Sequence, residues 1–303
     1  MSALSNQPWH SHDQFALLVN ARSFLFVPAN RPQRYDKALA AGADAIIIDL
    51  EDAVAPADKV TARQHLALAF ARFDAGERKR VVVRMNAIGT AWEAGDLALL
   101  AQLAVQGLTG VMVPKAETLA GLQCVALTVG PACALLPQIE SVAGLDAANA
   151  LAGAPQVLRL VFGNLDFQAD LGLACGPNEE ELGPVRLALV LAARRAKACA
   201  PVDGVTLGTQ DSAQLASDAA RSRRAGFTGK LCIHPSQVAQ VNMAFAPSAA
   251  ELAWAQRVVD AFKACGGGVF SLDGRMVDAP VLRLAERTLA PHHKNANNAK
   301  ASS

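Results

Sequence analysis

The sequence predicts an eight-stranded β/α barrel, the TIM-barrel architecture, with a short extension at its C-terminal end. Short apolar runs rich in β-branched residues alternate with longer amphipathic stretches between Ser23 and His234, a pattern typical of parallel strands joined by helices. Several runs are apolar without alternation, as expected of strands covered on both faces. The length of 303 residues suits one such barrel with an appendage.

Eight segments are expected to form the strands, and each is a short apolar run. They cover residues 23–27, 45–50, 81–86, 110–115, 134–140, 158–163, 201–206 and 230–235. The stretches between them are rich in Ala, Leu and Arg at helical spacing, for example 61–73 and 187–198. A doubly wound open sheet is the alternative, but no glycine-rich phosphate-binding motif follows the first strand. The closed barrel therefore explains the pattern better.

Beyond the eighth strand, the sequence predicts a helix–hairpin–helix extension. A Ser–Glu capping box at 248–251 opens a helix. Three glycines at 266–268 interrupt the chain, and an Asp-Gly pair at 273–274 between apolar flanks predicts a hairpin turn. A last helix over 279–289 precedes a polar tail. The expected domains are a leader segment (1–21), the barrel (22–246), the extension or lid (247–290) and a disordered tail (291–303).

Composition and charge narrow the class of protein. Hydrophobic residues make up 52% of the chain and charged residues 18%, as in a protein with a large core. The net charge of +1 does not indicate nucleic acid or a membrane surface as a partner. No apolar run approaches the roughly 18 residues that span a bilayer, and the first residues do not resemble a signal peptide. The six cysteines are scattered without a CxxC pair, which favours reduced thiols in a cytoplasmic protein.

Polar side chains close most of the predicted strands, at the end of a β/α barrel where active sites lie. Any one of them could equally form an ion pair at the barrel mouth, because a buried charge must be paired. The set is more informative, since it places carboxylates from three strands near one arginine. The residues are Asp49, Glu51 and Asp52 after the second strand, Arg84 and Asn86 after the third, Lys115 after the fourth, Glu140 after the fifth, Asp166 after the sixth and His234 after the eighth.

Glu140 and Asp166 are the candidate metal ligands. They lie one β/α unit apart, so their strands should be neighbours about 5 Å apart. Two carboxylates at that separation, with water and substrate in the other positions, suit Mg²⁺. His234 is a candidate third ligand, although its position between an isoleucine and a proline favours a structural, hydrogen-bonded histidine. Asn86 and Lys115 are expected in supporting or structural roles.

These motifs resemble those of the HpcH/HpaI aldolase group, which includes the citrate lyase beta subunit and free-standing malyl-CoA and citramalyl-CoA lyases. The matching segments are RSFLFVPANRPQRYDKA, DLEDAV, VRMN, VPKAE, QIES, FGNLDF, GFTGKLCIHPSQ and DGRMVDAP, in this order over residues 22–290. The resemblance implies a Mg²⁺-dependent lyase, with Mn²⁺ as a substitute, whose substrate carries coenzyme A.

The resemblance also implies roles for individual residues. Glu140 and Asp166 would bind the metal, and Arg84 would contact the substrate carbonyl or carboxylate. An aspartate on the extension, here Asp278, would be the acid/base supplied to a neighbouring subunit's site. This aspartate also precedes an Ala-Pro pair and would be expected there as a helix N-cap alone. The carboxylates that would orient the arginine and hold metal-bound waters are Asp49, Glu51 and Asp52.

The implied reaction is a reverse Claisen cleavage of a 3-hydroxyacyl thioester to acetyl-CoA and an oxo acid such as pyruvate, glyoxylate or oxaloacetate. The carrier would be coenzyme A or an acyl-carrier protein. The resemblance and the extension favour a homo-oligomer, with a trimer preferred. Basic residues near the first two strand ends could meet the carrier's phosphates or form a solvated helix face; they are Arg31, Arg34, Lys37, Lys59 and Arg63.

Three other functions stay open. Lys115, if desolvated at its strand end, could be the nucleophile of a Schiff-base aldolase. The same metal site could hydrolyse the thioester in place of cleaving a carbon–carbon bond. The chain could also be a non-catalytic subunit of a citrate lyase-type complex. The cluster of Arg84, Glu140 and Asp166 argues against the last function, because an inert barrel does not need costly buried charges.

Overall fold

The computed structural model describes the backbone of residues 15–300 and the side chains of residues 15–289. The chain divides into two compact units, Met1–Phe245 and Ala246–Ser303, and each has a hydrophobic core of its own. Most of the predicted leader (1–14) and the last three residues of the predicted tail lie outside the described residues.

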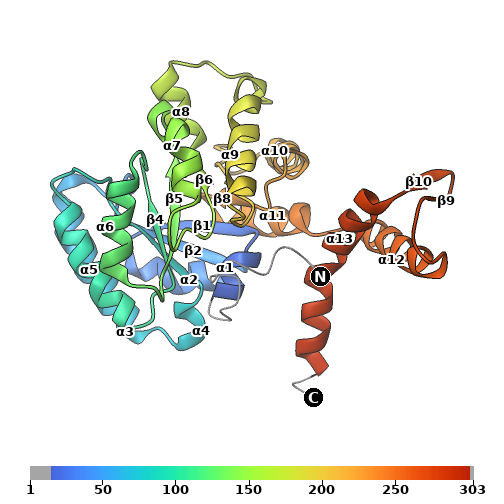
Figure 1. The fold of residues 1–303 in the computed structure, drawn as a ribbon. Helices are drawn as coiled ribbons and strands as arrows, with labels where there is room; N and C mark the ends of the chain where they lie inside the picture. Colours follow the sequence, from blue (N-terminus) through green and yellow to red (C-terminus); the bar gives the residue numbers. More distant parts are fainter. Residues whose placement is uncertain (1–14, 301–303) are drawn as a thin grey trace. The chain divides into compact units, whose positions relative to one another are not determined.

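The first unit is a closed barrel of eight parallel strands (Figure 1). The strands pair in chain order, and β8 pairs with β1 to complete the ring. All eight overlap the segments predicted from the sequence, which confirms the expected fold class. The strands are β1 (Ser23–Pro28), β2 (Ala45–Asp49), β3 (Val81–Arg84), β4 (Gly110–Val113), β5 (Ala134–Ile139), β6 (Val161–Phe162), β7 (Val202–Asp203) and β8 (Gly229–Cys232).

Two strands are much shorter than predicted. β6 and β7 have two residues each, and each is followed by a glycine, Gly163 or Gly204. Pro201, directly before β7, has no backbone N–H to donate to a neighbouring strand. The glycines and the proline shorten the run of backbone hydrogen bonds between neighbouring strands, although β6 and β7 still complete the barrel.

Helices cover the outside of the barrel (Figure 1). The predicted helix at 187–198 begins earlier, at Gly183, because Pro184 stands in its first turn, where a missing N–H is tolerated. The helices are α1 (Ala16–Asn20), α2 (Tyr35–Ala40), α3 (Lys59–Arg72), α4 (Ala75–Arg78), α5 (Glu93–Val105), α6 (Leu119–Val129), α7 (Val142–Ala152), α8 (Asn164–Leu171), α9 (Gly183–Arg195), α10 (Ser212–Ala225) and α11 (Val238–Phe245), with 3-10 turns η3 (Pro32–Arg34), η4 (Pro56–Asp58), η5 (Glu180–Leu182) and η6 (Pro235–Gln237).

The strands are mostly apolar because both of their faces are buried. Ile47 and Val82 belong to a cluster to which all eight strands contribute, so this cluster fills the barrel interior. Ile46 and Val83 belong to a larger cluster that the strands share with the surrounding helices. Each such side chain stabilises the fold by about 1.5–3 kcal/mol relative to exposure.

Part of the predicted leader belongs to the barrel. Leu18 of α1 is fully buried, and Phe15 is 3% exposed, within the interior cluster. The buried guanidinium of Arg159 donates to the carbonyl oxygens of Leu18 and Ala21 at 3.2 and 2.9 Å. The barrel therefore begins before residue 22, and α1 packs into its interior.

The second unit has the expected helix–hairpin–helix order: α12 (Ala249–Ala264), β9 (Phe270–Leu272), β10 (Arg275–Val277) and α13 (Ala279–Lys300). The capping box between Ser248 and Glu251 is present. Asp273 and Gly274 form the hairpin turn with φ of 51° and 73°, the left-handed values that a two-residue turn requires. The backbone of α13 continues past Pro291 to Lys300, where the sequence predicted a helix end at 289 and then disorder, so this proline does not end the helix.

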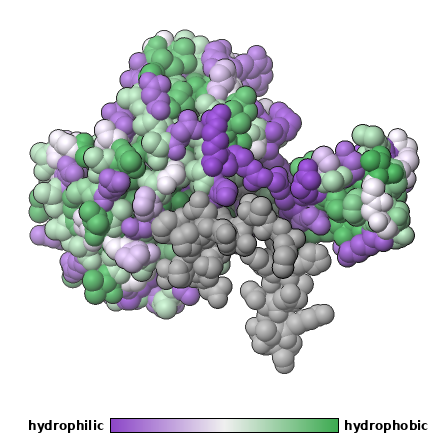
Figure 2. Space-filling model, viewed as in Figure 1, coloured by the Kyte–Doolittle hydropathy of each residue, from purple (hydrophilic) through white to green (hydrophobic). Residues whose placement is uncertain are grey.

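Among the helices of the described chain, none is long and apolar enough to cross a membrane. On the face shown in Figure 2, hydrophilic and hydrophobic residues are interspersed over the barrel surface. Exposed apolar side chains such as Leu68, Val105 and Leu127 come from three different helices, α3, α5 and α6.

Candidate active site

A cavity of about 720 Å³ lies at the C-terminal ends of the barrel strands. Its lining includes Asp49 at the end of β2, Arg84 from β3, Gln138 from β5, Asp166 from α8 and His234 after β8. A volume of about 300–1,000 Å³ is usual for a small-molecule site. The cavity therefore gathers most of the strand-end residues predicted from the sequence around a space that a small ligand would fill.

Arg84 and Asp49 form the base of the site. The parallel register of β2 and β3 places these two strand-end residues side by side. Arg84 donates from Nε and Nη2 to the two carboxylate oxygens of Asp49, each at 2.7 Å. Asp49 also accepts the backbone N–H groups of Glu51 and Ala53 at 2.9 and 3.1 Å. This bidentate pair holds the guanidinium in one orientation.

The remaining amino group of Arg84 faces two more carboxylates. Nη1 lies 3.1 Å from Glu51 Oε2 and 3.7 Å from Asp52 Oδ2, and the guanidinium carbon lies 4.7 Å from the ring centroid of Phe26. Burial alone would lower the pKa of Arg84, but Asp49 and the other two carboxylates outweigh it and raise the pKa. Asp49, Glu51 and Asp52 thus surround Arg84 as the sequence predicted.

Lys115 connects this cluster to the two predicted metal ligands. Its ammonium lies 2.7 Å from Glu51 Oε1, 3.9 Å from Glu140 Oε1 and 4.0 Å from Asp166 Oδ1. Burial alone would lower the pKa of Lys115, but the hydrogen bond and charge of Glu51 raise it. Lys115 has a φ of 45°, a strained value that persists only where neighbouring contacts hold it. Glu140 and Asp166 therefore face one common position, as predicted.

Glu140 is 2% exposed, directly after β5. It accepts the backbone N–H of Lys115 at 2.7 Å and the side-chain amide of Gln138. Burial raises the pKa of Glu140 to about 8, and the Glu51 and Asp166 carboxylates add to the effect. The carboxylate thus lacks full compensation of its charge, and a divalent cation beside it would supply that compensation.

Asp166 lies in the first turn of α8 rather than at the strand end itself. Its side chain is 43% exposed and lines the cavity. The N-terminal turn of a helix stabilises a negative charge. The Asp166 carboxylate is therefore open to a ligand from the cavity side.

The oxygen-rich surroundings of these two carboxylates fit a hydrated Mg²⁺. Gly163 leaves space for Glu140, because a Cβ at this position would collide with the carboxylate. Gln138 Oε1 is buried without a hydrogen-bond partner. Among the described residues, no group of three or more His, Cys, Asp or Glu is arranged to hold a metal. An ion here would need Glu140, Asp166 and oxygens from water or substrate, which is the mode of binding that Mg²⁺ favours.

His234 and Asn86 have structural partners. His234 Nδ1 lies 2.7 Å from Ser236 Oγ, which agrees with the hydrogen-bonded role that the sequence favoured. Asn86 donates from its side chain to Asp96 Oδ2 at 2.7 Å. Asp96 also accepts from Arg63 at 2.9 Å. The side chains of Asn86 and Arg63 are therefore both bound to Asp96, and neither lines the cavity.

The basic residues predicted to meet a carrier divide into three groups. Arg34 and Lys37 line the cavity, whereas Arg31 is exposed and is not part of the lining. Lys59 is buried and donates to the carbonyl oxygens of Leu50 and Glu51, both at 2.7 Å. Lys59 therefore holds the loop after β2, and its buried ammonium forms neither the carrier contact nor the solvated helix face that the sequence left open.

Asp278 lies in the second unit and caps α13. Its Oδ1 accepts the backbone N–H of Val281 at 3.1 Å, as the sequence pattern of an N-cap predicts. Its assignment as an acid/base for another subunit stays a prediction.

Sequence reasoning missed Gln138 and Gly163. Gln138 stands two residues before Glu140, so both side chains point to the same face of β5, and this spacing was the available signal. Gly163 directly follows β6, and a glycine at a strand end was a sign of a close approach.

Comparisons with known proteins point to one family. The family model described as HpcH/HpaI aldolase/citrate lyase matches residues 22–235. A protein of Cereibacter sphaeroides named (3S)-malyl-CoA thioesterase is 35% identical over 272 residues, which cover 89% of this chain and 93% of that protein. The L-malyl-CoA/beta-methylmalyl-CoA lyase of Rhodobacter capsulatus is 33% identical over 294 residues, covering 88% of this chain and 92% of the relative.

A solved structure shares the fold over most of the chain. It is the crystal structure of CitE from Mycobacterium tuberculosis in complex with magnesium, acetoacetate and coenzyme A. The TM-score is 0.77 with 37% sequence identity, and the match covers 90% of this chain and 98% of that one.

Proposed function

Because this chain belongs to the HpcH/HpaI aldolase/citrate lyase family, we propose that it is a Mg²⁺-dependent lyase that cleaves a carbon–carbon bond in a 3-hydroxyacyl-CoA. The products would be acetyl-CoA and an oxo acid. The observation that carries the proposal is the convergence of Arg84, Glu140 and Asp166 at the barrel mouth, where Lys115 and Glu51 connect them. The lyase of R. capsulatus and the magnesium and coenzyme A in the related CitE structure support it.

Glu140 and Asp166 would hold the metal. Bound Mg²⁺ supplies Lewis acidity toward the hydroxyl and carboxylate of the substrate. The protein fixes Glu140 rigidly through the Lys115 N–H and Gln138. Mn²⁺ would serve in place of Mg²⁺, since both are hard cations that prefer oxygen ligands.

Arg84 would stabilise the negative charge that develops on the thioester oxygen as the carbon–carbon bond breaks. Its guanidinium is pre-oriented by Asp49 and is 7% exposed. A fixed cation in a site shielded from water lowers the barrier most where charge appears only in the transition state. Asp49 and Glu51 would act through Arg84 by holding it in place, and Asp52 would hold a water at the cavity edge.

Asp278, or a water that it positions, would protonate the enolate carbon, so that the acetyl-CoA product gains a proton in balance with the one that the substrate hydroxyl loses as it becomes the carbonyl of the oxo acid. A carboxylic acid can perform this step when it lies within hydrogen-bond reach of the carbon. We propose that Asp278 acts in the active site of a neighbouring subunit. The protein would then be a homo-oligomer, and a trimer is the expected form. Light scattering of the purified protein gives the number of subunits directly.

The carrier of the acyl group is proposed to be coenzyme A. Arg34 and Lys37 line the cavity and could pair with its phosphates, whose charges arginine and lysine bind well. Arg31, exposed nearby in sequence, would add to the local positive charge. An acyl-carrier protein, which presents a phosphopantetheine in place of a full coenzyme A, is the alternative carrier.

A thioesterase is the second candidate, favoured by the name of the C. sphaeroides relative. Both reactions would start from the same bound substrate, but hydrolysis releases free coenzyme A and the intact hydroxy acid. The two are separated by measuring oxo acid and free thiol in the same reaction.

A Schiff-base aldolase fits the site poorly. Such an enzyme needs a neutral lysine amine, whereas the Glu51 carboxylate raises the pKa of Lys115 and keeps it protonated. Borohydride trapping of a Lys115 adduct, with activity that survives EDTA, would overturn this argument. A non-catalytic subunit remains the outcome if no thioester reacts in a protein that binds metal.

The direct test measures oxo-acid release from malyl-, methylmalyl-, citramalyl- and citryl-CoA, first with Mg²⁺ and then with EDTA. Cleavage of at least one thioester that stops on chelation is the expected result. Free thiol without oxo acid would establish the thioesterase instead.

A further inference from the structure

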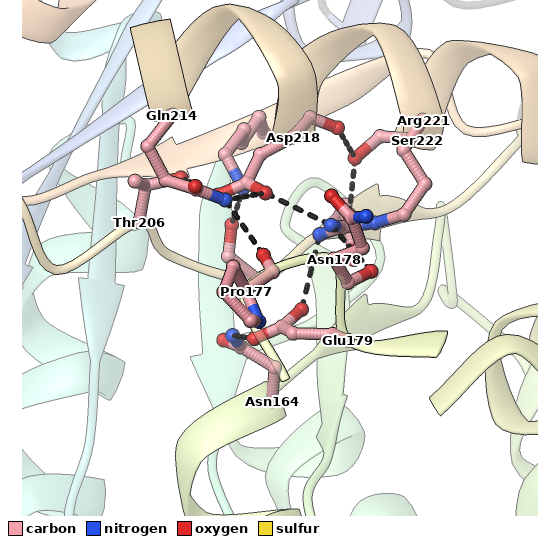
Figure 3. Close-up of polar contacts among 12 residues, drawn as sticks. Asn164, Pro177, Asn178, Glu179, Thr206, Gln214, Asp218, Arg221 and Ser222 are labelled. Carbon is pink, nitrogen blue, oxygen red and sulfur yellow. Dashed lines mark hydrogen bonds and ion pairs between the residues drawn. The ribbon is translucent and has the colours of Figure 1, made fainter. Parts of the chain in front are cut away.

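A second polar cluster connects α8, the loop before η5 and α10 (Figure 3), and Arg186 adds α9 to it. At its centre is Glu179, in the loop before η5, with a side chain that is 16% exposed. Its Oε1 accepts from Asn164 at 2.8 Å and from Gln168 at 3.3 Å. Its Oε2 accepts from Arg186 and, at 3.0 Å, from Arg221. One carboxylate therefore contacts side chains from three consecutive helices of the barrel wall, α8, α9 and α10.

The two α8 residues that contact Glu179 flank Asp166 on either side in the sequence, at positions 164 and 168. Asn164 is further anchored to the chain after β7, because it accepts the N–H of Val205 at 2.9 Å and donates to its carbonyl oxygen at 3.2 Å. A Cβ on Gly204 would collide with the Asn164 side chain. The first turn of α8 is thus clamped between the β7 connection and Glu179.

Glu179 is itself held from the barrel side. Arg186, which is 2% exposed, pairs with Asp203 of β7 at 3.0 Å and also with Glu179. Glu179 has φ 44° and ψ 45°, a left-handed conformation that is unfavourable for a residue with a side chain. Ion pairs therefore run from β7 through Arg186 to Glu179, and hydrogen bonds continue from Glu179 to α8.

We propose that Glu179 is a positioning residue that sets the orientation of Asp166 toward the metal. This inference rests on the proposed function, since it takes Asp166 to be a metal ligand. Glu140 is fixed at its strand end by two hydrogen bonds, whereas Asp166 stands on an eight-residue helix that Glu179 holds on both sides of the ligand. Loss of a residue that orients a metal ligand typically weakens metal binding about 10–100-fold.

The test is the Kd of Mn²⁺ for the full-length protein, measured by calorimetry and by the electron paramagnetic resonance of free Mn²⁺. Glu179→Gln keeps the size of the side chain but removes its charge. Asp218→Asn is the matched control, because it removes one carboxylate from the same cluster. The partners of Asp218 are Thr206, Gln214 and Arg221, which lie after β7 and on α10.

Glu179→Gln should raise the Kd about tenfold or more, and Asp218→Asn should change it by less than about threefold. A Glu179→Gln protein that folds and keeps the wild-type Kd would overturn the proposal, as would an equal rise in both variants. If Glu179→Gln does not fold, Asn164→Ala removes the shorter of the two α8 contacts of Glu179 and should also raise the Kd. A wild-type protein that binds no Mn²⁺ would count against the proposed function rather than against the positioning role.

Discussion

Replacing Arg84 with lysine separates the geometry of this residue from its charge. The guanidinium makes two 2.7 Å bonds to Asp49 and lies 3.1 Å from Glu51. A lysine ammonium is a point charge without the planar fork, so it cannot keep all three contacts. Asp49 and Glu51 would still face a cation, so the fold should persist. The free energy of unfolding should fall by about 1.5–3 kcal/mol, the contribution of one charged hydrogen bond.

Catalysis should fall further than stability. Removing one well-placed donor to a developing oxyanion typically lowers kcat by about 10²–10³, or about 2.7–4 kcal/mol. Arg84→Lys should therefore show a kcat for oxo-acid release reduced by that factor. The Kd of Mn²⁺ should change by less than about threefold, because Glu140 and Asp166 keep their own contacts.

Arg22→Lys is the matched control. Arg22 makes a similar forked pair with Asp44, at 3.1 and 3.3 Å, directly before β1 and β2 at the opposite end of the barrel. Its replacement should lower the melting temperature without lowering kcat. Unchanged turnover in Arg84→Lys, or a loss of metal affinity as large as its loss of turnover, would refute the role assigned to Arg84.

Three further predictions concern the metal ligands and the extension. Metal-free protein should lose stability progressively as the pH rises from about 4.5 to about 8, because burial raises the pKa of Glu140 from its usual value of 4.5 to about 8 in the folded chain. Between these values the folded chain holds a proton that the unfolded chain has released, so a rise in pH favours unfolding; Glu140→Gln should flatten the thermal-unfolding profile against pH. Gly163→Ala should weaken Mn²⁺ binding at least about tenfold and destabilise the fold by about 1–3 kcal/mol, since its methyl group would collide with Glu140; an unchanged Kd would contradict this. Asp278→Asn should keep the α13 cap and the Kd of Mn²⁺ but lower kcat about 10²-fold or more; full activity would leave Asp278 as a cap alone.

The barrel could be predicted because its signal is repeated eight times. Each strand has a buried inner and a buried outer face, as Ile47 and Ile46 show, so continuous apolar runs mark the positions of the strands. The ends of the strands were less certain. β6 and β7 shorten where glycine and proline interrupt the ladder, and no periodicity reports such local geometry.

The grouping of Asp49, Arg84 and Glu140 at one end of the barrel also followed from the sequence. Parallel strands of a closed barrel deliver their final residues to one rim, so position in the chain was enough. The contacts within the group could not be predicted. The link from Lys115 to Glu51 depends on a left-handed backbone at Lys115, which is rare for a residue other than glycine.

Buried charges away from the strand ends escaped sequence reasoning altogether. Arg159 and Lys230 are at most 1% exposed, and each stands in a run read as apolar strand. Their partners are distant in sequence: Arg159 donates to Ala21 O, and Lys230 donates to Gly204 O at 2.7 Å. Pairings of this kind become visible only when the fold brings the segments together, and the Glu179 cluster is another example.

The measurement that tests the central claim most directly is the product analysis of malyl-, methylmalyl-, citramalyl- and citryl-CoA with wild-type protein, Glu140→Gln and Asp166→Asn. The account predicts that the wild-type protein releases an oxo acid and acetyl-CoA from at least one thioester in the presence of Mg²⁺. Both variants, and the wild-type protein in EDTA, should release neither product. Oxo-acid release that persists in EDTA or in both variants would contradict the metal-dependent lyase.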